Sequence, residues 1–375
     1  MRVALVSVWA VILTGGIMQT ANGLQTDLLS LRSGLEAFPA WSIGFIMASY
    51  YVGYSCGPVL SPYIIRRLGH VATVAVTVTI AAFIIVLHGY LVTPVVWGIL
   101  RAFDGLALSC TYVALESWIN ERSENRVRGR IFSLYMVLQM IGMTVAQELL
   151  TLGNPRTLSL FLMSAGIFAI GIIPILGAGK QAPHHAPPQP FGLRHLFEVS
   201  PLGAITTALA GVSWSIYFTF GPLYAQGKGF DLSGVGLFMG VAMATGAVLQ
   251  FPLGWLSDTI GRRLTIGLLC AAAFLAALFG MWTESASVTL KIVASAFAGG
   301  LIFPLYSLSV AQINDAIAPK MRVAAAAGLV LLFGLGSIVG PLLTGYAVTL
   351  FGSVAFFAVL AATMAASVAA AAVTR

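Results

Sequence analysis

Arg101 and Asp104 are opposite charges three residues apart in residues 94–118, a segment that is otherwise mostly apolar. On a helix this spacing places both side chains on the same side, where they partly neutralise each other. A charge near the centre of a membrane costs about 2.5–3.5 kcal/mol on insertion scales, so uncompensated charges are rare there. The pair indicates either a functional charge inside the protein or a structural ion pair that keeps helices in register.

Further polar residues share the helix face of Arg101. At about 100° per residue, Gly105, Tyr112 and Glu116 fall within about 60° of it. A face that is polar along its length is expected to line a water-filled cavity and not to contact lipid. We therefore place Tyr112 among the candidate substrate-cavity residues.

A second polar stripe lies in the first apolar run. Gln19, Asn22 and Thr26, with Gly15 and Gly23, fall within roughly 100° of a helical wheel. Uncharged amides beside small residues suit hydrogen bonds to a solute in a cavity, and they also suit contacts between helices. We favour the cavity for Gln19, Asn22 and Thr26.

Three further polar residues are assigned by helix face or by depth in the span. Gln139 shares a helix face with Tyr135 and Gly142, so we add Gln139 to the cavity candidates. Glu148 lies about 180° away from Gln139 and is expected to reach water. Asp27, near an outer surface, is also expected to be solvated.

Aromatic residues mark the second half of the chain. Trp214, Tyr217 and Tyr224 form a stripe at helical spacing, and Tyr306 lies in a later apolar run. Such stripes are often packing, but an aromatic cavity wall would favour an amphipathic or planar solute. Trp214, Tyr217 and Tyr306 complete the cavity candidates.

The composition shows which elements must position these residues. Of 375 residues, 59% are apolar and 8% are charged, whereas soluble domains carry roughly 25% charged residues. This excludes a soluble enzyme, a nucleic-acid-binding module and a disordered chain, and it argues against an alternating β-barrel. We predict an all-α membrane protein with twelve transmembrane helices, at residues 4–27, 41–65, 71–92, 94–118, 129–151, 157–178, 200–224, 234–256, 264–283, 288–312, 322–348 and 350–372.

The spans divide into two halves. A shift of 194 residues pairs Gly105 with Gly299, and a shift of 192 pairs Gly69 with Gly261, among other matches. Parallel six-span repeats are typical of two-lobed secondary transporters. We expect two pseudo-symmetric six-helix bundles, residues 1–178 and 200–375, joined by a proline- and histidine-rich cytoplasmic linker at 179–199.

The formal net charge of +7 comes from 19 Lys and Arg against 12 Asp and Glu. Most of these cations fall in alternate loops, as expected when basic residues are retained in the cytoplasm. This pattern predicts that both termini are cytoplasmic. It also explains the positive net charge without an acidic binding partner. The three scattered cysteines suggest neither a disulfide framework nor a metal site, and we expect no cofactor and no metal.

Residues 254–263, GWLSDTIGRR, resemble the signature loop G-x-x-x-D-[RK]-x-G-[RK]-[RK] of the major facilitator superfamily. Residues 101–105, RAFDG, resemble its R-x-x-x-G motif. The first-half copy of the loop, at 62–70, has Arg66 where the family has Asp. The segments NGLQT (22–26), YYVG (50–53) and FPLYSL (303–308) are similar to the bacterial YcaD-like subgroup.

This resemblance implies roles for the charged residues. The span-four Arg of the family takes part in proton coupling, which makes Arg101 and Asp104 the coupling candidates. By the same analogy, charges at the cytoplasmic span ends would form a gate that is broken and remade during transport. The gate candidates are Asp258, Arg262, Arg263, Glu116, Arg128 and Arg130, and the alternative is that they are solvated loop charges.

We therefore expect a secondary active transporter, and no enzyme, in the bacterial inner membrane. It would move a small solute by alternating access, with protons as the coupling ion, as a monomer. One alternative is an uncoupled facilitator. The other is a non-transporting membrane sensor or scaffold with the same fold, which ought to lack a polar cavity. No nucleophile–base or metal-ligand constellation supports an intramembrane enzyme.

Overall fold

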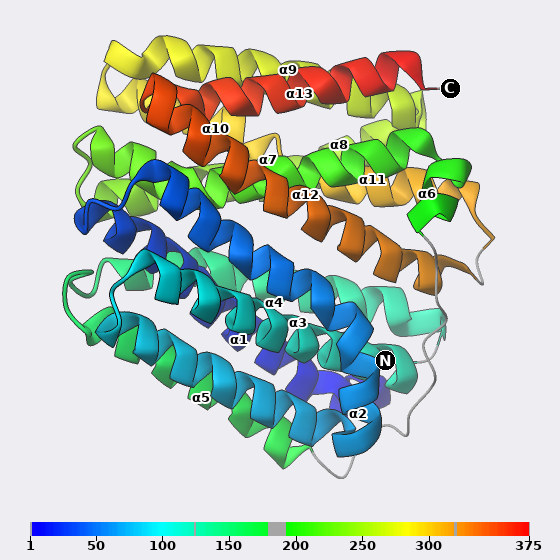
Figure 1. Cartoon of the computed structure of the whole chain (residues 1–375). Helices are drawn as coiled ribbons and strands as arrows, with labels where there is room; N and C mark the ends of the chain where they lie inside the picture. Colours follow the sequence, from blue (N-terminus) through cyan, green and yellow to red (C-terminus); the bar gives the residue numbers. More distant parts are fainter. Residues whose placement is uncertain (1, 124, 179–192, 319–320, 375) are drawn as a thin grey trace. The chain divides into compact units, whose positions relative to one another are not determined.

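The computed structural model describes residues 2–123, 125–178, 193–318 and 321–374, and almost all of them are helical (Figure 1). Ten helical segments in these ranges are long and apolar enough to cross a membrane. The predicted all-α membrane fold is confirmed. Helices also cover the twelve predicted spans. The first span lies in α1, which is not among the ten segments, and α2 contains the second and third spans.

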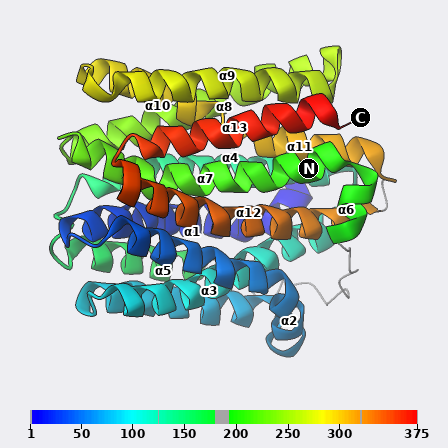
Figure 2. The same cartoon turned by 45° about the horizontal axis from the view of Figure 1, so that its top comes forward.

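The chain divides into two compact units. The first contains Met1–Leu35 and Ser49–Pro188, and the second contains Glu36–Ala48 and Gln189–Arg375. In the first, α1 packs against α3, α4 and α5; in the second, α7 packs against α12, α13 and α11, and α9 against α13. Within each unit the long helices run side by side (Figure 2). The first unit contains α1 (Arg2–Leu35), most of α2 (Ala40–Tyr90), α3 (Pro94–Arg122), α4 (Asn125–Leu150) and α5 (Ser159–Gly177).

Besides the start of α2, the second unit contains α6 (Leu193–Val199), which covers the end of the predicted linker. Residues 179–192 of that linker lie outside the described residues. The predicted span 288–312 is formed by two helices that meet at Leu301 and Ile302, just before Pro304. Proline has no N–H for a helical hydrogen bond, which explains the break. The remaining elements are α7 (Pro201–Gly227), α8 (Leu232–Ile260), α9 (Arg262–Trp282), η2 (Thr283–Ser285), α10 (Val288–Gly300), α11 (Phe303–Ala316), α12 (Arg322–Phe351) and α13 (Ala355–Val373).

Two glycines interrupt the helices at equivalent places in the halves. The 51 residues of α2 would extend about 77 Å at about 1.5 Å per residue, more than twice the hydrocarbon thickness of about 30 Å. Gly69 breaks α2 with φ 80° and ψ 166°. Gly261 separates α8 from α9 with φ 96° and ψ 147°. The two residues paired by the sequence comparison thus share an unusual backbone conformation.

We expect Gly261→Ala to lower the free energy of unfolding by about 1–3 kcal/mol, because this region of backbone space is essentially restricted to glycine. A Cβ at Gly261 would meet no heavy atom within 4 Å, so the effect isolates backbone strain. Gly240, in the interior of α8, also has open space around it, and Gly240→Ala should be neutral or stabilising. Thermal unfolding in detergent measures both. Equal stability of the two variants would contradict the strain argument.

Candidate functional site

Asp104 is the centre of a buried polar cluster in the first unit. Its Oδ2 accepts a hydrogen bond from Arg101 Nη1 at 2.8 Å and another from Gln25 Nε2 at 2.7 Å. Asp104 and Gln25 are fully buried, and Arg101 is 2% exposed. The predicted ion pair is therefore present, away from the lipid-facing surface, and the cluster links α1 to α3.

Tyr50 of α2 closes another side of this cluster. The guanidinium carbon of Arg101 lies 4.2 Å from the centre of the Tyr50 ring, a cation–π contact that gains strength when it is shielded from water. Tyr50 is also stacked on Tyr54, with ring centres 5.8 Å apart. Arg101 thus has both an anionic partner and an aromatic partner.

Glycines bring α2 and α3 into backbone contact at this point. A Cβ on Gly105 would lie 1.9 Å from the carbonyl oxygen of Tyr50, and a Cβ on Gly53 would lie 1.8 Å from that of Ala102. Such distances are impossible for larger residues, so both positions require glycine. The close crossing places Tyr50 against Arg101.

Several polar atoms of the cluster have no hydrogen-bond partner among the described residues. They include Asp104 Oδ1, Gln25 Oε1, Arg101 Nε and, one turn away, Asn22 Oδ1. Leaving a buried polar atom unpaired generally costs about 1–3 kcal/mol. The second carboxylate oxygen of Asp104, Oδ1, can therefore accept a proton or a hydrogen bond from a polar ligand.

The predicted cavity residues of α1 and α3 meet next to this cluster. The Tyr112 hydroxyl group donates to Gln19 Oε1 at 2.8 Å. Gln19, Asn22 and Thr26 are all partly exposed, as residues that contact a solute must be. Gln139 of α4 is also partly exposed. Their role in solute binding stays a prediction.

Gln25 is a site residue that the sequence interpretation missed. It lies about 60° from Asn22 on the helical wheel, on the opposite side from Gln19 and Thr26. The available signal was its type, an amide in an apolar run. Its partner Asp104 is 79 residues away in the sequence, so the pairing depends on how α1 and α3 pack.

The expectation that Asp27 is solvated is wrong. Asp27 is 1% exposed, and its Oδ2 accepts a hydrogen bond from Gln147 Nε2 at 2.6 Å. The reason is that α1 continues to Leu35, so Asp27 lies inside the helix and faces α4. Glu148, in contrast, is exposed as expected.

The aromatic residues of the second unit separate into two environments. The Trp214 ring packs at 4.7 Å from Phe303 and at 6.2 Å from Phe333, and Tyr306 packs at 5.1 Å from Phe333. Trp214 and Tyr306 are both partly exposed. These residues of α7, α11 and α12 form an aromatic group that can offer ring faces to a planar solute.

Tyr217 lies in the other environment, inside the second unit. It is 1% exposed, and its hydroxyl group is 2.6 Å from Ser295 Oγ and 3.2 Å from the carbonyl oxygen of Phe238. Its hydrogen bonds are thus used within the protein. Tyr217 is therefore packed inside the second unit in this structure, and its role in solute binding stays a prediction.

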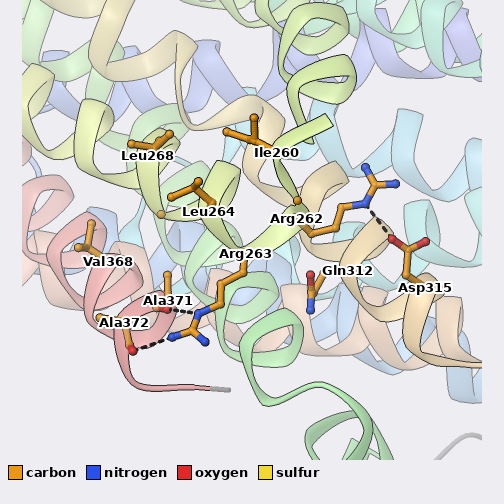
Figure 3. A pocket seen from close by; sticks show the side chains of 12 residues that line it. Ile260, Arg262, Arg263, Leu264, Leu268, Gln312, Asp315, Val368, Ala371 and Ala372 are labelled. Atoms are coloured by element: carbon orange, nitrogen blue, oxygen red, sulfur yellow. Dashed lines mark hydrogen bonds and ion pairs between the residues drawn. The ribbon is translucent and has the colours of Figure 1, made fainter. Parts of the chain in front are cut away.

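The predicted gate charges of the second unit form a network centred on Arg262. Arg262 Nε lies 2.9 Å from Asp315 Oδ2 of α11 (Figure 3). Its Nη1 lies 2.6 Å from Asp258 Oδ1 of α8. Arg263 donates to the carbonyl oxygens of Ala371 and Ala372 at 2.7 and 2.8 Å. These contacts join four helices of one unit.

The remaining gate candidates are in the first unit. Glu116 is partly exposed on α3. The side chains of Arg128 and Arg130 lie outside the described residues. A gate that involves these three residues stays a prediction.

Comparisons with known proteins agree with this architecture. A family model described as Major Facilitator Superfamily matches residues 4–329 and 204–375. An uncharacterized MFS-type transporter of Enterobacter sp. (strain 638) is 25% identical over 331 residues, which cover 88% of this chain and 85% of the relative. The MFS-type transporter YcaD of Escherichia fergusonii is 24% identical over 336 residues, which cover 89% and 87%.

Solved structures show the same fold. A mutant of the nucleoside transporter NupG superposes with a TM-score of 0.83 at 16% identity, covering 98% of this chain and 99% of that one. A bacterial homolog of the human lysosomal transporter Spinster, in an inward-facing and unoccupied conformation, gives a TM-score of 0.71 at 15% identity, covering 98% and 95%.

Proposed function

The chain belongs to the major facilitator superfamily, and from this premise we propose that it is a proton-coupled secondary transporter whose proton binds Asp104. It moves a small solute across the bacterial inner membrane by alternating access. The distribution of basic residues supports cytoplasmic termini. The Arg262 network, with Glu116, Arg128 and Arg130, is the proposed cytoplasmic gate.

The observation that carries the proposal is the double use of one Asp104 oxygen by Arg101 and Gln25. Unit charges 2.8 Å apart attract each other by about 6 kcal/mol at an effective dielectric constant of about 20. A proton on Asp104 removes this attraction and weakens the charge-assisted hydrogen bond from Gln25. The connection between α1 and α3 therefore depends on the charge of one carboxylate.

This dependence reaches the proposed solute site through α1. Gln19 and Asn22 lie on the same helix as Gln25, one or two turns away, and Gln19 is bonded to Tyr112 of α3. A change in how α1 packs on α3 changes the positions of these amides. Proton binding and solute binding are thereby linked without direct contact between proton and solute.

The test is transport by purified protein in proteoliposomes, with pH gradients of either sign. A panel of radiolabelled solutes first identifies a substrate; it includes nucleosides, because NupG is a nucleoside transporter and the aromatic group around Trp214 suits planar rings. We expect Asp104→Asn to abolish accumulation driven by the pH gradient and to retain solute exchange between equal concentrations.

Glu148→Gln is the matched control, since it neutralises an exposed acid of the same unit and should leave accumulation unchanged. Accumulation by Asp104→Asn at the rate of the unmodified protein would show that Asp104 is not the proton carrier. Transport by the unmodified protein that ignores the pH gradient and ionophores would identify an uncoupled facilitator.

A further inference from the structure

A groove of about 640 Å³ lies between the start of α9 and the end of α13, in the second unit (Figure 3). Arg262, Arg263 and Asp315 line its charged part, which we call the mouth. Its apolar lining, which we call the floor, includes Leu264, Leu268, Gly267, Val368 and Ala371. We refer to it as the α9–α13 groove. It combines charged and apolar chemistry in one continuous depression.

The groove starts at the level where membrane spans end. The candidate spans Leu232–Ile260 and Arg262–Ser285 meet at Gly261, and the span Ala355–Val373 ends beside them. Leu264 and Leu268 are 55% and 51% exposed, and they follow each other by about 6 Å along the helix axis. The charged mouth is thus at the height of lipid headgroups, and the apolar floor extends toward the hydrocarbon.

Arg263 supplies a cation at this mouth. Two of its N–H groups, on Nε and Nη2, are used by the carbonyl oxygens of Ala371 and Ala372. Because a guanidinium carries five N–H donors, three are left. Within the described ranges no carboxylate forms an ion pair with Arg263, whereas Asp258 and Asp315 are both held by Arg262.

The first turn of α9 adds to this positive character. Its N-cap is Gly261, which offers no side chain to the free N–H groups of the turn. The positive end of the helix dipole therefore faces the same mouth as Arg263. Together they complement a phosphate group.

We propose that the α9–α13 groove binds an anionic phospholipid. Its phosphate contacts Arg263 and the first turn of α9, and an acyl chain lies along Leu264, Leu268 and Val368. The charge complementarity selects an anionic headgroup, and the length of the apolar floor selects a lipid over a free anion. The proposal does not depend on which solute is transported or on proton coupling.

The experiment is native mass spectrometry of the full chain, released from detergent and titrated with dioleoyl phosphatidylglycerol or dioleoyl phosphatidylcholine, which have the same acyl chains. We expect phosphatidylglycerol to bind about tenfold more tightly, because its headgroup carries a net negative charge, whereas the choline cation of phosphatidylcholine offsets the phosphate charge that both lipids have. Arg263→Gln should remove this preference, and Arg263→Lys should retain part of it. Arg194→Gln, which removes a cation that is 92% exposed on α6, is the charge-matched control and should change nothing.

A second variant keeps Arg263 and fills the groove. A Cβ on Gly267 would meet only Ala371, at 3.6 Å, so Gly267→Ala should bind lipid normally. Gly267→Leu should weaken binding of phosphatidylglycerol about tenfold or more while the protein stays folded. Equal affinity of the unmodified protein for both lipids, or full binding by Gly267→Leu, would overturn the proposal. Displacement of the lipid by an equal concentration of inorganic phosphate would show a free-anion site instead.

Discussion

Arg101→Met is expected to lower the free energy of unfolding by about 3–5 kcal/mol, because it leaves the Asp104 carboxylate buried without its cation. Asp104→Leu likewise leaves the buried Arg101 without its carboxylate partner, although the cation–π contact with Tyr50 offsets part of the destabilisation. The double variant has two apolar side chains in place of the buried ion pair. Its loss in free energy of unfolding should be smaller than the sum of the losses of the two single variants by about 2 kcal/mol or more.

The measurement is a double-mutant cycle, with unfolding in detergent followed for the four proteins. The chain offers a control pair in Arg194 and Glu198, which are 2.8 Å apart like Arg101 and Asp104 but are 92% and 52% exposed. An exposed pair of this kind should couple by less than about 1 kcal/mol. Additive effects at Arg101 and Asp104 would mean that the two charges do not act as a unit.

Gly105→Val should have the other large effect. The new Cβ would overlap the carbonyl oxygen of Tyr50, 1.9 Å away, and a backbone atom cannot move aside as a flexible side chain can. The crossing of α2 and α3 must widen, which separates Arg101 from the Tyr50 ring. Overpacking of this kind lowers the free energy of unfolding by about 1–3 kcal/mol and occasionally more. For Gly105→Val we expect a decrease of at least about 3 kcal/mol, together with loss of transport.

Gly166→Ala in α5 is the matched control for this variant. A Cβ there would meet no atom within 4 Å, and alanine is the better helix former by about 1 kcal/mol. Thermal unfolding and solute uptake should therefore be unchanged or slightly improved in Gly166→Ala. A Gly105→Val protein as stable as Gly166→Ala would contradict the close crossing of α2 and α3.

Features that depend on residues close together in the sequence could be predicted from it. The Arg101–Asp104 pair was accessible because residues three apart share a helix side, and the spans were accessible because each needs a long apolar run. The place where Gly69 and Gly261 interrupt the helices was visible as a break with turn residues and charge. The resemblance of the loop at 254–263 to a family signature added the family itself.

Contacts between segments far apart in the sequence could not be predicted, because they depend on how the helices pack. The partners Gln25 and Tyr50 reach Arg101 and Asp104 only through the register in which α1, α2 and α3 pack. Arg263 binds backbone carbonyl oxygens, which every residue possesses and which leave no trace in residue type. Asp27 was misplaced because helix ends are read from composition, and α1 continues past its most apolar part.

The shared backbone conformation of Gly69 and Gly261 has a consequence for how the halves differ. The reversal between adjacent membrane crossings is set at both places by a residue without a side chain, so its shape does not rely on the charges around it. Arg66 and Asp258 occupy matching positions in these two reversals and carry opposite signs. A duplicated scaffold can in this way keep one hairpin geometry and still present unlike electrostatic faces to water.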